Sequence, residues 1–353
     1  MLDGVRGVAC LMVLVHHCGR GHGASWGARA FHKASAAGWA GVDLFFVLSG
    51  FLITGLLLEA RDRAEGPRRF WVRRAFRILP LAYAFLAAIL FSPFWRQEPW
   101  HAGVYAEQAW FWLFVNNWLI LFRPTLASGL LGHFWSLAIE EQFYLAWPLI
   151  TFGLSPRKLE TVCLVVLGVS LAVHLAAATR HVDPALLSSL TPTRLDGLVL
   201  GAWLAMRLRR IPPSRSLPNP HRPRIVAAAA LAILLLGSDR ALPGHASWIV
   251  AVGPSVLALT FALFLSGLLV SPRGAVVRSV CELRPLVALG RISYGFYVLH
   301  VPIIDSLRRH WPAADGSLAD ALGFFTAALL ASAALATISW FALERPMLRL
   351  RPD

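Results

Sequence analysis

Long apolar stretches, separated by short polar segments, follow one another along the whole chain. A transmembrane helix needs about 20 mostly apolar residues, and about ten stretches approach or reach that length. They cover residues 5–18, 39–58, 78–94, 134–153, 160–178, 191–206, 225–237, 247–270, 286–304 and 318–343. The pattern predicts an all-α, polytopic membrane bundle of about ten transmembrane helices.

One further apolar segment, 108–122, is interrupted by Asn116 and Asn117 and contains several tryptophans. Tryptophan is enriched at membrane–water interfaces, so we expect an interfacial or re-entrant helix here. With the amino terminus in the cytoplasm, most arginines and lysines then fall in cytoplasmic segments, above all in 59–77 and 207–224. Because positive charge accumulates on the cytoplasmic side, we expect both termini to be cytoplasmic.

Composition supports the membrane interpretation. Hydrophobic residues make up 57% of the 353 residues and charged residues only 15%, against about 25% charged in soluble domains. The net charge of +14 is explained by topology and lipid headgroups, so no nucleic-acid partner is expected. We expect one transmembrane domain over residues 1–353, with a first helix that is not cleaved as a signal peptide.

The cysteines stand apart from one another in the sequence. None forms a CxxC pattern, so neither a metal site nor a disulfide is expected. They are Cys10, Cys18, Cys163 and Cys281.

Ionisable residues inside apolar segments are costly and therefore mark functional candidates. Arg6 and His17 are eleven residues apart, which places them on one face of the first helix. A histidine near neutral pH can act as a general base, and His17 is preferred over the adjacent His16. The predicted topology places the other candidates, with His17, between the middle of the membrane and its outer face. They are Asp43, Glu140, Glu141, Arg194, Asp196 and His300.

This shared depth predicts one polar cavity in the bundle. The sequence does not decide which carboxylate contacts His17; Glu140 is favoured and Asp43 is second. Arg73, Arg74 and Arg77 lie at the cytoplasmic start of another span. Such a cluster can bind phosphate groups through bidentate hydrogen bonds, although lipid headgroups would explain it equally well.

Six segments together resemble acyltransferase family 3, a family of integral-membrane O-acyltransferases. They are LDGVRGVACLMVLVHH (2–17), GVDLFFVLSGFLIT (41–54), RRAFRILP (73–80), FWSLAIEEQFYLAWPL (134–149), TRLDGLVLG (193–201) and LGRISYGFYVLHVP (289–302). The resemblance implies an acyl-CoA donor from the cytoplasm and an acceptor hydroxyl on a carbohydrate or related molecule. The family's Arg-His motif falls on Arg6 and His17, which selects His17 over His16.

The resemblance also places the family's arginine motif on Arg73, Arg74 and Arg77, and its acidic motif on Glu140 and Glu141. Some members carry a C-terminal SGNH-type hydrolase domain, and we expect none here.

We therefore expect a multi-pass O-acyltransferase of a bacterial inner membrane that transfers an acyl group, most simply acetyl, without a metal. Arg6 would bind coenzyme A phosphates with the other arginines, and His17 would be the base. Further residues are expected to bind substrate or stabilise an oxyanion: Glu141, Arg194, Asp196, Ser136, Tyr294 and His300. The alternative is a proton-coupled transporter, because buried Glu, His and Arg also form proton relays; the absence of internal repeats disfavours it.

Overall fold

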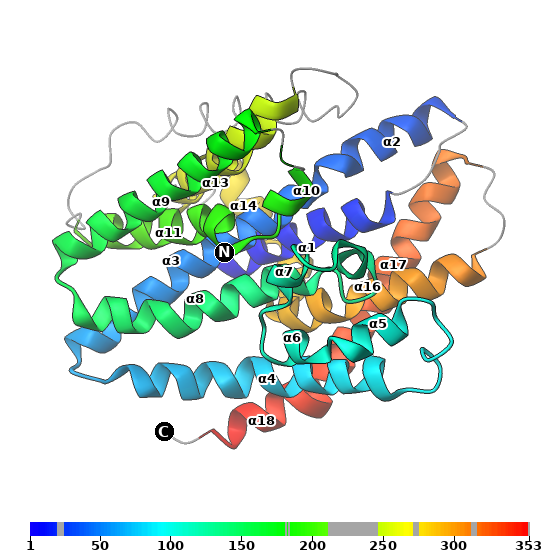
Figure 1. Ribbon diagram of the computed structural model, residues 1–353, viewed down its shortest axis with the longest axis horizontal. Coiled ribbons are helices and arrows are strands. Elements are labelled where there is room, and N and C mark those ends of the chain that lie inside the picture. Colours follow the sequence, from blue (N-terminus) through cyan, green and yellow to red (C-terminus); the bar gives the residue numbers. More distant parts are fainter. Residues whose placement is uncertain are drawn as a thin grey trace.

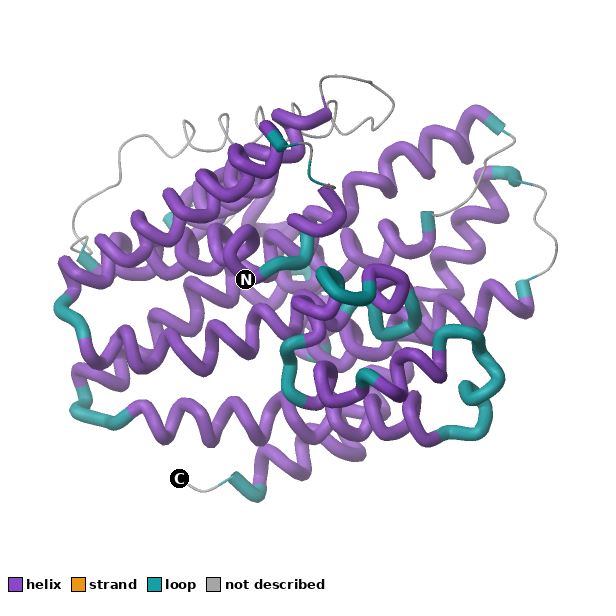
Figure 2. The backbone as a smooth tube through the Cα atoms, viewed as in Figure 1, coloured by secondary structure: helices purple, strands orange, loops and turns teal. Residues whose placement is uncertain are grey.

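The computed structural model describes residues 1–19, 25–180, 182, 184–210, 246–270, 275–311 and 316–351. Within these ranges every regular element is a helix (Figure 2). The predicted all-α fold is therefore confirmed. The predicted span 225–237 lies outside the described residues.

Of the predicted apolar segments within the described ranges, 78–94 begins eleven residues into its helix, and all nine overlap the long helices. These are α1 (Leu2–Cys18), α3 (Ala40–Asp62), α4 (Pro67–Phe91), α8 (Phe134–Gly153), α9 (Pro156–Thr179), α11 (Thr191–Arg209), α13 (Ala246–Leu269), α16 (Ser293–His310) and α17 (Leu318–Ser339). The shorter α-helices are α2 (Trp26–Ala36), α5 (His101–Ala106), α6 (Gln108–Trp112), α7 (Asn116–Leu119), α10 (Pro184–Leu187), α14 (Val276–Cys281), α15 (Arg284–Arg291) and α18 (Arg345–Arg349). Single turns complete the described elements: η1 (Ala37–Trp39), η2 (Pro124–Ser128) and the π-helical η3 (Trp340–Glu344).

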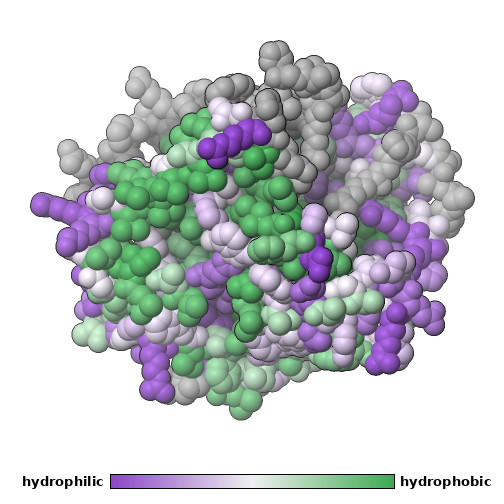
Figure 3. Space-filling model, viewed as in Figure 1, coloured by the Kyte–Doolittle hydropathy of each residue, from purple (hydrophilic) through white to green (hydrophobic). Residues whose placement is uncertain are grey.

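Four helical stretches of the described chain are long and apolar enough to cross a membrane: Trp26–Asp62, Pro67–Phe91, Pro156–Ala177 and Leu318–Arg349. The bent pair α15–α16 would make a fifth span. The long helices lie side by side along the long direction of Figure 1. On the face shown in Figure 3, hydrophobic residues cover much of the middle and hydrophilic residues gather toward the left and right edges. The count of about ten spans and the sides of the termini stay predictions.

Helix α3 is central, because it packs against α1, α8, α11 and α13. Its approach to α11 is especially close. A Cβ on Gly50 would lie 1.9 Å from the carbonyl oxygen of Leu198, and one on Gly201 would lie 2.0 Å from that of Val47. Glycine thus lets the two backbones meet.

Two segments differ from the expected pattern. The apolar stretch 286–304 is not one straight helix, because α15 and α16 meet at an angle of 82°. A Cβ on Gly290 would lie 1.7 Å from the carbonyl oxygen of Asp3, so α15 is held against α1. The segment 108–122 forms the short helices α6 and α7 rather than one helix.

Candidate active site

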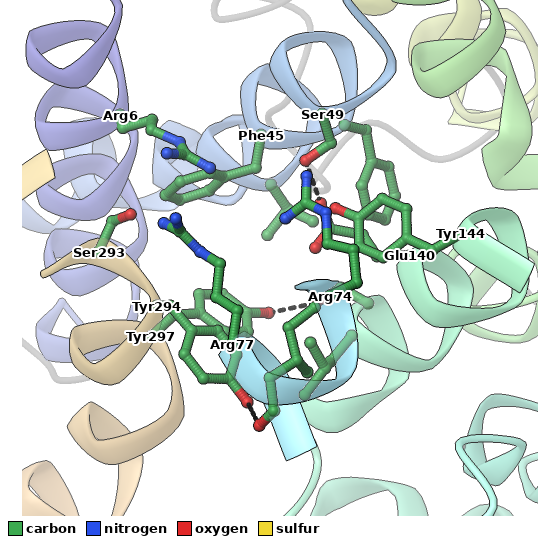
Figure 4. Close-up of a pocket in the computed structure, with 15 residues that line it drawn as sticks. Arg6, Phe45, Ser49, Arg74, Arg77, Glu140, Tyr144, Ser293, Tyr294 and Tyr297 are labelled. Carbon is green, nitrogen blue, oxygen red and sulfur yellow. Dashed lines mark hydrogen bonds between the residues drawn. The ribbon is translucent and has the colours of Figure 1, made fainter. Parts of the chain in front are cut away.

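A cavity lies between α1, α3, α4, α8 and α16 (Figure 4). Its wall is polar and aromatic in a bundle that is otherwise mostly apolar. The polar residues that line it are Arg6, Ser49, Arg74, Arg77, Ser136, Glu140, Tyr144, Ser293, Tyr294 and Tyr297. Buried polar groups converging on one concavity are typical of a binding site, so this cavity is the candidate active site.

Three arginines give the cavity a strongly positive character. Arg6 extends into it from α1, while Arg74 and Arg77 extend from α4 (Figure 4). Arg74 and Arg77 are three residues apart and therefore share a helix face. The guanidinium carbon of Arg74 lies 4.7 Å from the centre of the Tyr144 ring, which holds this side chain in place.

The fourth predicted arginine, Arg73, lies elsewhere. It is not among the described residues that line the cavity. Its Nε has no hydrogen-bond partner in the described part of the chain. The structure thus brings Arg6, Arg74 and Arg77 together and leaves Arg73 apart.

Glu140 is the acidic residue of the cavity. Its Oε1 accepts a hydrogen bond of 2.6 Å from the Ser49 hydroxyl, and its side chain lies on the same side of the cavity as Arg74 and Tyr144 (Figure 4). The neighbouring Glu141 is not among the described lining residues, and its Oε1 has no hydrogen-bond partner within the described ranges.

Hydroxyl groups line the other side of the cavity. The Tyr294 hydroxyl donates to the carbonyl oxygen of Ile78 over 2.6 Å. The Tyr297 hydroxyl forms hydrogen bonds with the Ser136 hydroxyl and with the His133 carbonyl oxygen. Ser136 and Tyr294 thus lie in the cavity wall, where an oxyanion-stabilising group has to be. Their catalytic roles stay predictions.

His17 lies beside His300, and the ring centres are 5.0 Å apart. Neither histidine is among the described lining residues. The link to the cavity is Tyr297, whose ring centre lies 5.6 Å from that of His300. The histidines therefore lie directly behind the cavity wall.

The carboxylates predicted to contact His17 have other partners. Glu140 is bonded to Ser49, as described above. The Asp43 Oδ1 accepts a hydrogen bond of 2.8 Å from Arg194, and both side chains are buried. Contact between His17 and either carboxylate stays a prediction.

Asp43, Arg194 and Asp196 form a separate buried cluster between α3, α11 and α13. The Asp196 Oδ2 accepts a hydrogen bond of 2.9 Å from the Ser255 hydroxyl. The Arg194 guanidinium lies over the rings of Phe46 and Trp135. None of the three charged residues is among the described lining residues of the cavity; only Phe46 belongs to both.

Four of the lining residues have no role assigned from the sequence, namely Ser49, Tyr144, Ser293 and Tyr297. Tyr297 follows Tyr294 at a spacing of three, which places both on one helix face; this spacing could have identified it.

In the described part of the chain, no group of three His, Cys, Asp or Glu side chains could hold a metal ion. The expectation of a metal-free site stays a prediction.

Comparison with known proteins identifies the family. A family model described as an acyltransferase domain matches residues 1–343. YrhL of Bacillus subtilis is 30% identical over 325 residues, which are 86% of this chain and 48% of YrhL. The peptidoglycan O-acetyltransferase OatA of Listeria monocytogenes is 28% identical, over 86% of this chain and 49% of OatA.

The O-acetyltransferase OatA of Staphylococcus aureus is also 28% identical, over 98% of this chain and 56% of its own length. The chain therefore spans about half the length of the curated relatives it matches. No solved structure matches it. The match over residues 1–343 shows that the chain belongs to acyltransferase family 3.

Proposed function

We propose that this membrane protein is an O-acyltransferase that transfers an acyl group, most simply acetyl, from acyl-CoA to a carbohydrate hydroxyl. The observation that carries the proposal is the cavity in which Arg6, Arg74 and Arg77 converge within an apolar bundle. The relatives named as peptidoglycan O-acetyltransferases support a peptidoglycan sugar as the acceptor class.

The arginines are suited to the phosphate groups of coenzyme A. A guanidinium group binds phosphate oxygens through paired, charge-assisted hydrogen bonds. The three guanidinium groups outnumber the single lining carboxylate, that of Glu140, so the net positive charge of the cavity would balance that of a bound diphosphate. With phosphates bound there, the pantetheine arm would extend toward Ser136 and Tyr297, at the wall that separates the cavity from His17.

The transfer step needs a base and a site for negative charge. His17 accepts the proton of the acceptor hydroxyl, whose oxygen attacks the thioester carbonyl. The carbon–sulfur bond then breaks, and the thiolate of coenzyme A receives the proton from His17. Ser136 or Tyr294 donates a hydrogen bond to the tetrahedral oxyanion. For this step the acyl group passes the Tyr297 ring to reach His17.

The test is His17→Ala in purified protein reconstituted into vesicles. The assay uses radiolabelled acetyl-CoA as the donor and a soluble peptidoglycan disaccharide fragment as the acceptor. We expect acetyl transfer to fall at least about a hundredfold, as for the loss of a general base, while acetyl-CoA binding is retained. His16→Ala, which changes the adjacent histidine, is the control and should remain active.

Unchanged transfer by the His17→Ala variant would reject His17 as the base. If the unmodified protein neither binds nor consumes acetyl-CoA, the acyltransferase proposal fails, and the proton-coupled transporter becomes the better explanation. A bacterial inner membrane is the location in which a cytoplasmic donor and an envelope glycan can reach the two sides of this protein.

A further inference from the structure

We infer that His300 is the positioning residue for His17: its imidazole Nε2 accepts the N–H of His17 and so fixes the tautomer in which His17 acts as a base. The inference rests on the proposed function, because it assigns a partner to the base of that reaction. It replaces the predicted role of His300 in substrate binding.

The surroundings of His300 define which of its nitrogens carries the proton. His300 is fully buried, and its Nδ1 lies 2.7 Å from the carbonyl oxygen of Tyr297. A carbonyl oxygen only accepts hydrogen bonds, so Nδ1 carries the hydrogen and Nε2 carries the lone pair. This Nε2 has no hydrogen-bond partner in the described part of the chain. A buried acceptor without a donor is rare in proteins and calls for an explanation.

The ring of His17 is placed to supply that donor. The two ring centres lie 5.0 Å apart, and the planes are inclined at 54°. A rotation of the His17 ring that directs one of its N–H groups at the Nε2 of His300 would form this hydrogen bond. His17 and His300 come from α1 and α16, which pack against each other.

A hydrogen bond to His300 would give His17 the properties that a base needs. A neutral imidazole has one donor and one acceptor nitrogen, and the bond made by one nitrogen decides the state of the other. When His17 donates from one nitrogen to His300, its other nitrogen keeps the lone pair for the acceptor hydroxyl. In Ser-His-Asp triads a carboxylate orients the histidine in the same sense.

The carboxylates do not compete for this role in the observed arrangement. Glu140 accepts a hydrogen bond from Ser49, and Asp43 pairs with Arg194. His300 also connects the base to the cavity, since Tyr297 holds its Nδ1 and lines the cavity with its own side chain.

The proton balance of the reaction is unchanged. The acceptor hydroxyl gives its proton to the lone-pair nitrogen of His17 as the oxygen attacks the thioester. The resulting imidazolium then donates more strongly to His300, which stabilises the charge. The same proton passes to the thiolate when the carbon–sulfur bond breaks, and His300 keeps its own proton on Nδ1 throughout.

The experiment compares His300→Leu with His300→Gln in the vesicle assay with acetyl-CoA and the peptidoglycan disaccharide. Leucine removes the acceptor, and we expect kcat to fall at least about tenfold, with the KM for acetyl-CoA unchanged within about twofold. Glutamine places an amide oxygen near the position of Nε2, so it should restore most of kcat. A merely structural role would not distinguish the two substitutions in this way.

His174→Leu is the matched control. His174 is equally buried, and its Nδ1 also bonds to a carbonyl oxygen of its own helix, that of Ser170. Because it lies on α9 rather than beside His17, its loss should leave kcat close to that of the unmodified protein. This control separates the loss of a buried histidine from the loss of a partner for His17.

Wild-type kcat in the His300→Leu variant would overturn the inference. So would a folded His300→Gln variant that is as inactive as the leucine variant. If the leucine variant does not fold, His300→Asn replaces it, because the shorter asparagine amide does not reach the position of Nε2. Equal activity of the Asn and Gln variants would then overturn the inference. Loss of activity in His17→Ala with full activity in His300→Leu would refute only this inference, whereas an active His17→Ala variant would refute the proposed base itself.

Discussion

At the scale of single residues, the ion pair between Asp43 and Arg194 makes the clearest prediction about stability. Both side chains are buried, and the contact is 2.8 Å. Arg194→Leu would leave the Asp43 carboxylate buried without its cation, at a cost of about 3–5 kcal/mol. We expect a lower midpoint of unfolding for the detergent-solubilised variant in a denaturant titration.

The double variant Asp43→Asn with Arg194→Leu is the informative comparison. Because it removes both charges, it should recover a large part of the lost stability. A single Arg194→Leu variant as stable as the unmodified protein would show that the pair contributes little to folding.

The sequence indicated the charged residues of the cavity but not their partners. Arg6, Arg74, Arg77 and Glu140 could be predicted, because ionic side chains are conspicuous in apolar segments. Tyr297 shares a helix face with Tyr294, but its contacts with Ser136 and His133 depend on how the helices pack. Partners that lie far apart in the sequence depend on tertiary packing, which a single chain's pattern does not encode.

At the scale of helices, the glycine contact between α3 and α11 determines whether the two helices can approach. Gly50→Ala would place its methyl group 1.9 Å from the carbonyl oxygen of Leu198. Because backbone cannot yield as a flexible side chain does, we expect destabilisation of about 1–3 kcal/mol and reduced acetyl transfer. Unfolding and transfer measured on the same preparation check this.

Gly55→Ala is the matched control for that prediction. Gly55 lies on the same helix, but nothing lies within 4 Å of a Cβ added there. This variant should keep both the stability and the activity of the unmodified protein. Equal behaviour of the Gly50 and Gly55 variants would contradict the importance of the close approach.

Helix positions were predicted more accurately than helix shape. The apolar segments 39–58 and 134–153 correspond to α3 and α8, because hydropathy directly measures what lipid requires. The bend between α15 and α16 was missed, although Gly290, Arg291 and Ser293 interrupt the apolar segment 286–304 at that point. Next to the bend, Gly290 packs against the backbone of α1, a contact between residues that are far apart in the sequence.

At the scale of the whole molecule, the two ends of the bundle differ in chemistry. The cavity arginines lie in the first halves of α1 and α4, Arg6 in α1 and Arg74 and Arg77 in α4. At the other end, the segment after α4 is tied to the end of α16 by an ion pair of 2.5 Å between Glu98 and Arg309. The hydrogen bond from Arg309 lowers the pKa of Glu98, because it stabilises the ionised carboxylate.

In the proposed reaction the donor comes from the cytoplasm and the acceptor lies outside, so the two ends of α4 should lie on opposite sides of the membrane. The test is to determine which end of α4 faces which side. The helix has 25 residues, so it is about 37 Å long and can cross the membrane. Gly66 and Gln97 are exposed and flank its two ends. The proposed topology places Gly66 in the cytoplasm and Gln97 outside.

We therefore expect Gly66→Cys to react with a membrane-impermeant maleimide only after the cytoplasmic face is opened, and Gln97→Cys to react in intact spheroplasts. The unmodified protein provides the background, because Cys10, Cys18, Cys163 and Cys281 are all buried and should react slowly. Labelling of both positions from one face would mean that α4 does not cross the membrane. Labelling in the reverse sense would mean that the arginine end of α4 faces outward, away from cytoplasmic acyl-CoA. The donor site proposed for Arg6, Arg74 and Arg77 could not then function.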